Sequence, residues 1–231
     1  MEWEEREKLM YAKETVGFYI TGHPLANALA ELKTITDSDI ANLNNLNEGQ
    51  PVRVGGLIRE CKQHKSKRGE PMAFVTLEDI ADAVEVMVFP ETYATCYHLL
   101  ATPDPVVVSG TIQKGERGAK IIADQIDLIP EALQKYTESI HATLDAGSVT
   151  RPRLEELKQL LFNYHGTCPF SLTLHFAGEG EVDVDINKDF TVTPSREMAE
   201  QVREIFGYDP LTFNKTTLEV KKRRKWKKQE A

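Results

Sequence analysis

Cations gather in two short stretches of this 231-residue chain. The segment 59–69, RECKQHKSKRG, sets five cations against one glutamate: Arg59, Lys62, Lys65, Lys67 and Arg68. The segment 113–120, QKGERGAK, adds Lys114, Arg117 and Lys120. Clustered cations neutralise phosphates and release counterions, which gives affinity for nucleic acid without sequence preference and a steep dependence on salt. The pattern predicts a flexible basic loop that binds phosphate. The alternative is a charged loop that only keeps the chain in solution.

An Asp-x-Asp pair, Asp183 and Asp185, is the kind of pair with which polymerases hold two magnesium ions. Here the surrounding EVDVDI (181–186) alternates strictly between apolar and acidic residues, which is typical of a half-buried strand with a solvated side. The spacing of DVDINKD also lacks the Gly and Glu that a calcium loop needs. The pair therefore predicts a strand and no metal site.

Cysteines and histidines show no ligand spacing either. The three cysteines, Cys61, Cys96 and Cys168, are far apart and form no CxxC motif, so neither a zinc site nor a disulfide framework is expected. His23 follows a helical pattern over 3–20 that Gly22 and Pro24 end, and it is read as part of that helix stop. Glycine-rich phosphate loops and nucleophile elbows are missing. We expect no cofactor, no catalytic residue and no catalytic activity in this chain.

Five short strands and one brief helix surround the basic segments. The strand patterns are VRVGGLIRE (52–60), AFVTLED (73–79), AVEVMVFP (83–90), PVVVSGTIQ (105–113) and AKIIADQIDLI (119–129), and ETYATCYHLL (91–100) lies between the third and the fourth. This order predicts a five-stranded Greek-key barrel of the oligonucleotide-binding (OB) kind over residues 49–131. Its expected ligand is a nucleic-acid strand.

Alternation within the second and third strands predicts which side chains meet that ligand. Val75, Leu77, Val84, Val86 and Val88 face inward, and Phe74, Thr76, Met87 and Phe89 face outward. OB barrels lay a single strand across this outer face and stack bases on its aromatic rings. Glu78 and Glu85 share the face and repel phosphate, so the ligand is expected to lie nearer the loops. The alternative is that a neighbouring domain covers Phe74 and Phe89.

The regions beside the barrel complete an α+β fold. Residues 1–48 are predicted to hold a helical segment and a polar linker at 34–50, and residues 215–231 form a basic tail. Residues 132–214 mix strand patterns at 139–145, 171–176 and 181–190 with two helices, which predicts a small α+β domain.

The two helices of this domain have sequence signals at their ends. The helix at 151–164 places Leu154, Leu157 and Leu161 on one stripe and stops at Gly166. The helix at 193–206 has Thr193 as cap, Pro194 at its first position and Gly207 as terminator.

Charge is distributed unevenly along the chain. The formal net charge is −8, yet the tail carries 8 of the 28 lysines and arginines, and removing it leaves −14. Residues 137–212 hold 13 acidic and 6 basic side chains, which disfavours phosphate and favours a protein partner. The tail, with Trp226 among its cations, could bind nucleic acid, stay solvated or fold back on the acidic domain. No apolar run of membrane-spanning length and no signal peptide occur, so a cytoplasmic location is expected.

An ordered series of motifs resembles a known family. The motifs are GFYITGHPL (17–25), VRVGGLI (52–58), KRGEPMAFVTLED (67–79), VEVMVFPETY (84–93), LKQLLFNYHGTCPFSLTLHF (157–176) and DFTVTPSREMAEQVREIFG (189–207). They resemble the C-terminal part of the bacterial replicative DNA polymerase III alpha subunit over about residues 2–207. One departure is the turn at Ala81 and Asp82, where the family usually has a Gly, which suggests a different turn.

The resemblance implies a parent protein that polymerises DNA from deoxynucleoside triphosphates. In that family the OB domain lies near single-stranded template, and in some lineages the last domain docks the clamp-loader tau subunit. The chain is too short to hold the whole polymerase, so we read it as a non-catalytic fragment that binds single-stranded DNA and links to tau. The alternatives are a protein-interaction adaptor whose barrel binds no nucleic acid, and an OB module that binds RNA or tRNA.

Overall fold

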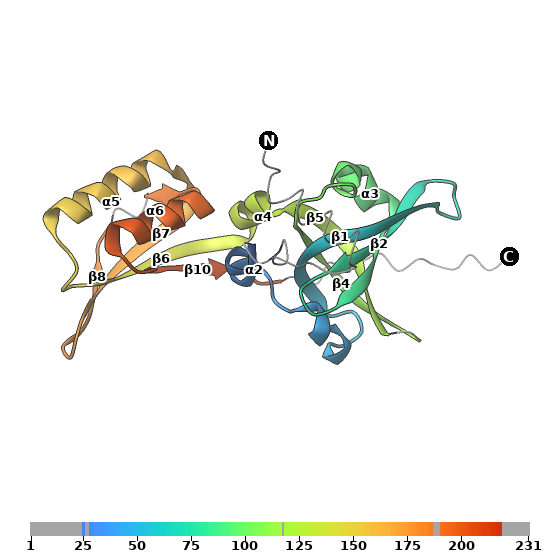
Figure 1. Cartoon of the computed structure of the whole chain (residues 1–231), viewed down its shortest axis with the longest axis horizontal. Helices are drawn as coiled ribbons and strands as arrows, with labels where there is room; N and C mark the ends of the chain where they lie inside the picture. The colour runs from blue at the N-terminus through green and yellow to red at the C-terminus, as the bar shows by residue number, and fades with distance from the viewer. Residues whose placement is uncertain (1–24, 26–27, 117, 187–189, 219–231) are drawn as a thin grey trace, which may run out of the picture.

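The structure, a computed structural model, describes residues 25, 28–116, 118–186 and 190–218. It has a closed barrel of five strands and a second, open sheet, with two short helices between them (Figure 1). The predicted α+β fold class with a five-stranded barrel is confirmed. The predicted helix at 3–20, its stop at Gly22 and Pro24, and the basic tail from residue 219 onward lie outside the described ranges.

The barrel is built from strands β1 (Pro51–Lys65), β2 (Pro71–Glu78), β3 (Ala83–Val88), β4 (Val106–Gly115) and β5 (Gly118–Leu128). They close in the order β1-β2-β3-β5-β4, and only the β3–β5 pair is parallel. A helix, α3 (Pro90–Cys96), and the 3-10 turn η3 (Tyr97–Leu99) join β3 to β4, as the sequence predicts.

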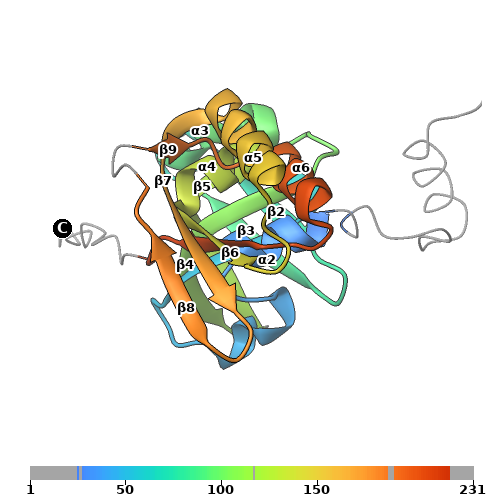
Figure 2. The same cartoon turned by 90° about the vertical axis from the view of Figure 1, so that its left-hand side faces the viewer.

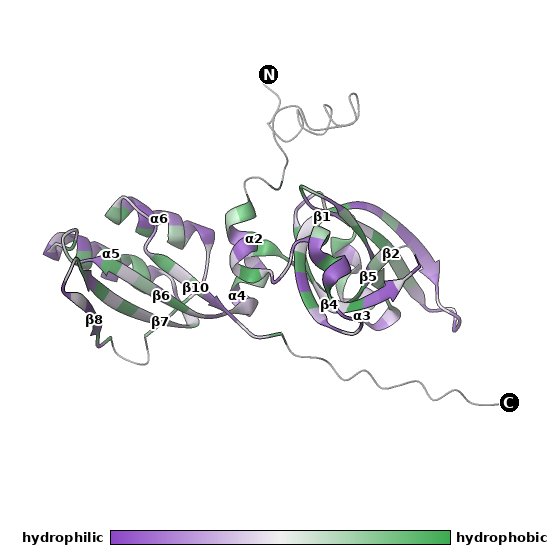
Figure 3. Cartoon of the chain, turned by 90° about the horizontal axis from the view of Figure 1, so that it is seen from below, coloured by the Kyte–Doolittle hydropathy of each residue, from purple (hydrophilic) through white to green (hydrophobic). Residues whose placement is uncertain are grey.

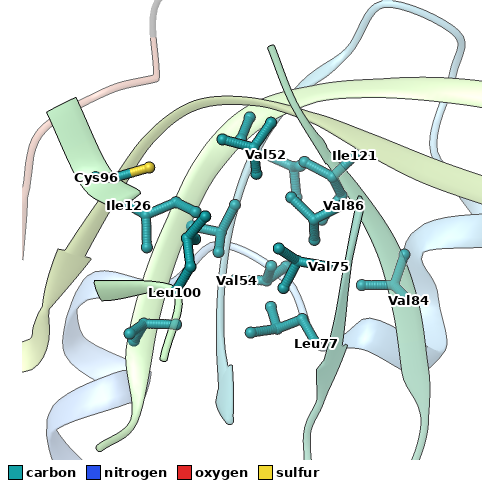
Figure 4. Packing of buried hydrophobic residues seen from close by; sticks show 14 of the residues in the cluster. Val52, Val54, Val75, Leu77, Val84, Val86, Cys96, Leu100, Ile121 and Ile126 are labelled. Carbon is teal, nitrogen blue, oxygen red and sulfur yellow. The ribbon is translucent and has the colours of Figure 1, made fainter. Parts of the chain in front are cut away.

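Aliphatic side chains from all five strands fill the barrel (Figure 4). Val75, Leu77, Val84, Val86 and Val88 are 5% exposed or less, which confirms the predicted inward face of β2 and β3. Burying a side chain of this size stabilises the fold by about 1.5–3 kcal/mol, so this core is the main support of the barrel.

Strand β1 is much longer than the sequence suggests. It pairs with β4 over residues 51–56 and with β2 over residues 57–65, and it reaches Lys65. The prediction of a flexible loop over 59–69 is therefore wrong, since only residues 66–70 form the turn. Gly56 lies where β1 changes partner, and a Cβ there would come 2.7 Å from the Glu78 carbonyl oxygen. Only glycine lets the two strands approach so closely.

The turn between β2 and β3 needs no glycine. The Asp79 Oδ1 accepts hydrogen bonds of 2.8 Å from the backbone N–H groups of Ala81 and Asp82, and the Asp79 N–H donates to the Asp82 carbonyl at 2.9 Å. No non-glycine residue within the described ranges has a positive φ. The side-chain-supported turn explains why Ala81 and Asp82 are accepted here.

The polar stretch 34–50 is more structured than a linker. It contains the end of helix α2 (Leu29–Ile35) and the 3-10 turn η2 (Ile40–Asn45). Ile40 and Leu43 are buried in the barrel core, and the Ile40 N–H donates to the Asp79 Oδ2 at 2.9 Å. The asparagine-rich composition hid these two apolar anchors, which close one end of the barrel.

The second domain has the strand order β10-β6-β7-β8: β6 (Thr137–Asp145), β7 (His165–Phe176), β8 (Gly180–Val184) and β10 (Leu211–Lys215), with β9 (Thr191–Val192) also paired to β7. Helices α5 (Arg151–Asn163) and α6 (Arg196–Phe206) pack on one face of this sheet (Figure 2). The short polar run LTFNK gave no strand signal, so β10 was missed.

Several predicted helix details of the second domain are corrected. The buried stripe of α5 is Leu157, Leu160 and Leu161, while Leu154 is 37% exposed. Gly166 does not end α5; it lies in β7, where a Cβ would come 2.3 Å from the Thr193 Oγ1.

The predicted end of helix α6 is confirmed, but its predicted start is wrong. The cap is Ser195, whose Oγ accepts from the Met198 N–H at 3.1 Å, and neither Thr193 nor Pro194 holds its predicted place. Thr193 instead donates its backbone N–H to the Tyr164 carbonyl at 2.6 Å. Gly207 ends the helix with φ +82°, as predicted.

Helices α2 and α4 (Ile129–Tyr136) join the two domains (Figures 1 and 3). They bury an apolar cluster against β1 and β4: Leu25, Ala28, Leu32, Ile35, Val107, Ile129, Ala132, Leu133 and Tyr136. The predicted boundary between residues 131 and 132 thus falls inside a packed helix.

Candidate nucleic-acid interface

The outer face of the barrel carries a row of side chains that crosses four strands. The register pairs Lys62 with Phe74, Phe74 with Met87, and Met87 with Ile122. Since paired residues project on the same side of a sheet, these four side chains form one continuous strip, which we call the outer row. The neighbouring polar row is Glu60, Thr76, Glu85 and Lys120.

Aromatic rings are accessible on this face. Phe89, at the end of β3, is 41% exposed. Phe74 is half-buried, and the His64 ring meets it edge-on at 5.2 Å between centroids. A base could stack on either ring, because every base offers a flat face and stacking needs no sequence preference. His64 was not among the predicted contacts, because residues 59–69 were expected to form a loop. In the structure His64 pairs with Met72, two residues from Phe74 along β2.

The β1–β2 turn forms an ordered cationic tip. The Ser66 Oγ accepts from the backbone N–H groups of Arg68 and Glu70, and the Gly69 N–H donates to the Ser66 carbonyl at 2.9 Å. Gly69 has φ +82°, which glycine adopts without strain. The tip, defined as residues 65–70, places Lys65, Lys67 and Arg68 beside the single carboxylate of Glu70. A rigid turn holds these cations together at lower entropic cost than a flexible loop would.

Three other predicted cations are already paired with carboxylates. The distances are 3.5 Å for Arg59 Nη1 to Glu78 Oε2, 3.0 Å for Lys62 Nζ to Glu60 Oε1 and 2.6 Å for Lys120 Nζ to Glu85 Oε1. These pairs are partly exposed, so each contributes under about 1 kcal/mol and can exchange its carboxylate for a phosphate. The tip, with three cations and one carboxylate, carries a net charge of +2 beside the outer row.

The β4–β5 hairpin is fastened to η2. The Asn44 Oδ1 accepts from the Ala119 N–H at 2.8 Å, and the Lys114 Nζ donates to the Asn44 carbonyl at 3.4 Å. The Glu48 carboxylate also accepts from the Lys114 backbone N–H. Lys114 thus contacts the chain itself, and Arg117 lies outside the described residues.

The second domain meets a different side of the barrel. The joining helices pack on Val107 and Leu57, whereas the β1–β2 and β4–β5 hairpins project from the side that faces away from the second sheet (Figure 1). None of the described residues of the second domain covers Phe89. Among the described residues, Phe89 is therefore accessible to a ligand, and Phe74 is half-buried.

Asp183, Cys96 and Cys168 are held by the fold in the described part of the chain. Asp183 accepts a hydrogen bond of 2.7 Å from the Thr173 Oγ1 on neighbouring β7. No three His, Cys, Asp or Glu side chains among the described residues are placed to hold a metal ion. Burial raises the pKa of the Cys96 and Cys168 thiols to about 11, so both are protonated and unreactive near neutral pH.

Comparison with known proteins shows a similarity to an OB-fold family over the barrel and to a polymerase subunit over most of the chain. Residues 52–129 match the tRNA_anti-codon family, described as an OB-fold nucleic acid binding domain. The chain is 29% identical over 211 residues, 90% of its length, to the DNA polymerase III subunit alpha of Pseudomonas aeruginosa. The same subunit is 28% identical over 219 residues in Neisseria meningitidis and 27% identical over 215 residues in Mycobacterium tuberculosis, which is 92% and 89% of this chain.

The resemblance to the DNA polymerase III alpha subunit is confirmed. These alignments span 18% of the length of each alpha subunit, so this chain corresponds to less than a fifth of them. The helices within the described ranges are too short or too polar to cross a lipid bilayer.

Proposed function

We propose that the barrel binds single-stranded DNA along the outer row and the hairpin tip. The observation that carries the proposal is the accessible pair of rings, Phe74 and Phe89, next to a rigid cationic tip on a barrel of the nucleic-acid-binding OB family. Rings supply stacking of about 1–3 kcal/mol per base, and the tip supplies phosphate contacts. Thr76, Met87 and Lys120 line the same path, and Arg59, Lys62 and Lys114 flank it. Arg117, outside the described residues, stays a contact proposed from the sequence alone.

The second domain is proposed to connect this chain to other subunits of a polymerase III holoenzyme, through the clamp-loader tau subunit. The similarity to alpha subunits and the excess of acidic residues over 137–212 support a protein partner rather than DNA. In this proposal the parent protein is a DNA-directed DNA polymerase of the cytoplasm. The present chain has no catalytic role and guides template.

The test is a titration of a fluorescein-labelled oligothymidine against the chain, at two salt concentrations, read by fluorescence anisotropy. The Lys65→Ala/Lys67→Ala/Arg68→Ala variant is expected to flatten the plot of log affinity against log salt by about 2, since each single-strand phosphate contact contributes about 0.7. A matched control removes three exposed cations of the second domain, with Arg151→Ala, Lys158→Ala and Arg203→Ala. The control is expected to leave the slope unchanged.

Three results would contradict the proposal. A wild-type chain that binds no oligonucleotide at the lower salt would favour the adaptor function, with the barrel contacting only proteins. Preference for RNA over DNA of equal length would favour the RNA-binding module that the tRNA_anti-codon match suggests. An equal loss of slope in the tip variant and in the control would remove the tip from the binding site.

A further inference from the structure

Arg53 is a buried cation on the side of the barrel opposite to the tip. Its neighbours Val52 and Val54 point into the barrel, so Arg53 points outward, and there α2 and α4 reduce its exposure to 2%. The Nη1 donates to the Ile35 carbonyl at 2.9 Å, at the C-terminal end of α2. The guanidinium lies over the Tyr136 ring of α4, 4.0 Å from its centroid. A buried charge is costly to keep, so these contacts must offset a large desolvation penalty.

Tyr136, which lies under the Arg53 guanidinium, is itself hydrogen-bonded to two barrel strands. Its hydroxyl donates to the Asp127 Oδ2 of β5 at 2.7 Å and accepts from the Ser109 Oγ of β4 at 3.2 Å. Asp127 also accepts from the Gln125 Nε2 at 2.8 Å. Desolvation by burial raises the pKa of the Tyr136 hydroxyl, which keeps it a donor over the physiological range. The position of α4 on the barrel is thereby fixed by directional bonds.

The last residue of β10, Lys215, and the residue after it, Thr216, complete the cluster from the second domain. The Thr216 Oγ1 accepts from the Arg53 Nη2 at 3.4 Å, and the Thr216 N–H donates to the Tyr136 carbonyl at 2.8 Å. The Lys215 Nζ lies 3.1 Å from the Asp37 Oδ1, and Asp37 Oδ2 lies 3.8 Å from the Arg53 Nη1. A separate ion pair of 3.3 Å joins Arg196 of α6 to Glu31 of α2.

We propose that Arg53, Asp37, Tyr136, Lys215 and Thr216 form a latch that fastens the barrel to the second domain in one orientation. An apolar cluster alone would hold α2 and α4 together but tolerate sliding, because hydrophobic burial is non-directional. The latch adds hydrogen bonds and ion pairs from both domains that fit only one arrangement. The two domains then move as a single body, and the outer row keeps a fixed direction relative to α5 and α6.

The experiment measures the distance between spin labels on the two domains by pulsed electron resonance. Labels are attached through Glu91→Cys on α3 and Lys158→Cys on α5, both exposed, in a chain with Cys61→Ser; Cys96 and Cys168 are 2% and 5% exposed. The wild-type latch is expected to give a single narrow distance distribution. A broad or double distribution would overturn the proposal.

The latch variant is Lys215→Met/Thr216→Val, which leaves both domain cores intact because neither residue is buried. It is expected to lose the narrow peak. The matched control, Asn214→Ala on the same strand, removes a 3.0 Å hydrogen bond to the Ser139 Oγ inside the second domain and should keep the peak. A narrow peak in the latch variant would also overturn the proposal. Affinity for oligothymidine should be unchanged in both variants, so this result is independent of the DNA-binding test.

Discussion

The two halves of strand β1 place cations in opposite environments. Over residues 51–56 the strand pairs with β4, and its arginine, Arg53, is buried under two helices. Over residues 57–65 it pairs with β2, and the side chain of Arg59 is 63% exposed and bonded to a single carboxylate. The same residue type on one strand is therefore either buried between the barrel and the joining helices or exposed to solvent. Whether such an arginine is buried or exposed depends on which elements cover the outward side of the strand.

The largest effect is expected from removing the buried cation. Arg53→Met should lower the free energy of unfolding by about 3 kcal/mol, because it leaves the buried Ile35 carbonyl without its charged donor and removes the contact with the Tyr136 ring. Arg59→Met is the matched control in the other half of the strand and should cost under about 1 kcal/mol. Urea unfolding followed by circular dichroism measures both. Equal losses of unfolding free energy in the two variants would show that the two halves of β1 do not differ in this way.

The point where the halves meet should tolerate no side chain. Gly56→Ala brings a Cβ to 2.7 Å from the Glu78 carbonyl oxygen, and forcing β1 and β2 apart should cost about 1–3 kcal/mol. Gly115→Ala is the control, since its Cβ would meet the nearest atoms at 3.6 Å. The same urea unfolding decides. A neutral Gly56→Ala would show that the two strands can separate without loss.

The exposed ring of Phe89, on the outer face that the second half of β1 borders, should affect binding rather than stability. Phe89→Ala should weaken oligothymidine binding by about 1–3 kcal/mol through lost stacking, while the free energy of unfolding changes little because the ring is 41% exposed. Tyr97→Ala removes an aromatic ring that is 61% exposed on η3, off the outer face, and should leave binding unchanged. Fluorescence anisotropy measures both. Similar losses for the two variants would place the ligand elsewhere.

The smallest effect is expected from releasing a paired cation. Glu85→Gln frees Lys120 from its 2.6 Å ion pair, so oligothymidine should bind more tightly, by under about 1 kcal/mol at low salt. The gain should disappear as salt rises, since exposed charges are screened. Unchanged binding at low salt would show that the ligand does not reach this row.

Much of the barrel could be predicted from the sequence because its core follows a strict two-residue period. Val75, Leu77, Val84, Val86 and Val88 alternate with less buried residues such as Thr76, Glu85 and Met87, so both the strands and their faces could be assigned. The assignment of Phe74 and Met87 to one outer face follows from the same period, and the register places them opposite each other. The local sequence pattern was sufficient to assign a strand and its buried face wherever every second residue of the strand is buried.

The remaining features depend on contacts between distant segments. The end of β1 was read as a loop because KQHK has no apolar period, yet its backbone pairs with β2. The burial of Arg53 could not be predicted from the strand pattern, since only the packing of α2 and α4 buries it. Thr193 and Ser195 are both good caps, and the bond from the Thr193 N–H to the Tyr164 carbonyl determines which of them starts α6.

The 3-10 turn η2 determines how much the binding face can change shape. It holds the β2–β3 turn through the Ile40 N–H and Asp79, and it holds the β4–β5 hairpin through Asn44 and Ala119. These two loops border the same end of the outer face. Each is hydrogen-bonded to η2, so neither can open without breaking that bond. The shape of this end of the outer face is thus set when the chain folds, and an oligonucleotide bound as proposed would lose little affinity to reorganisation of the protein.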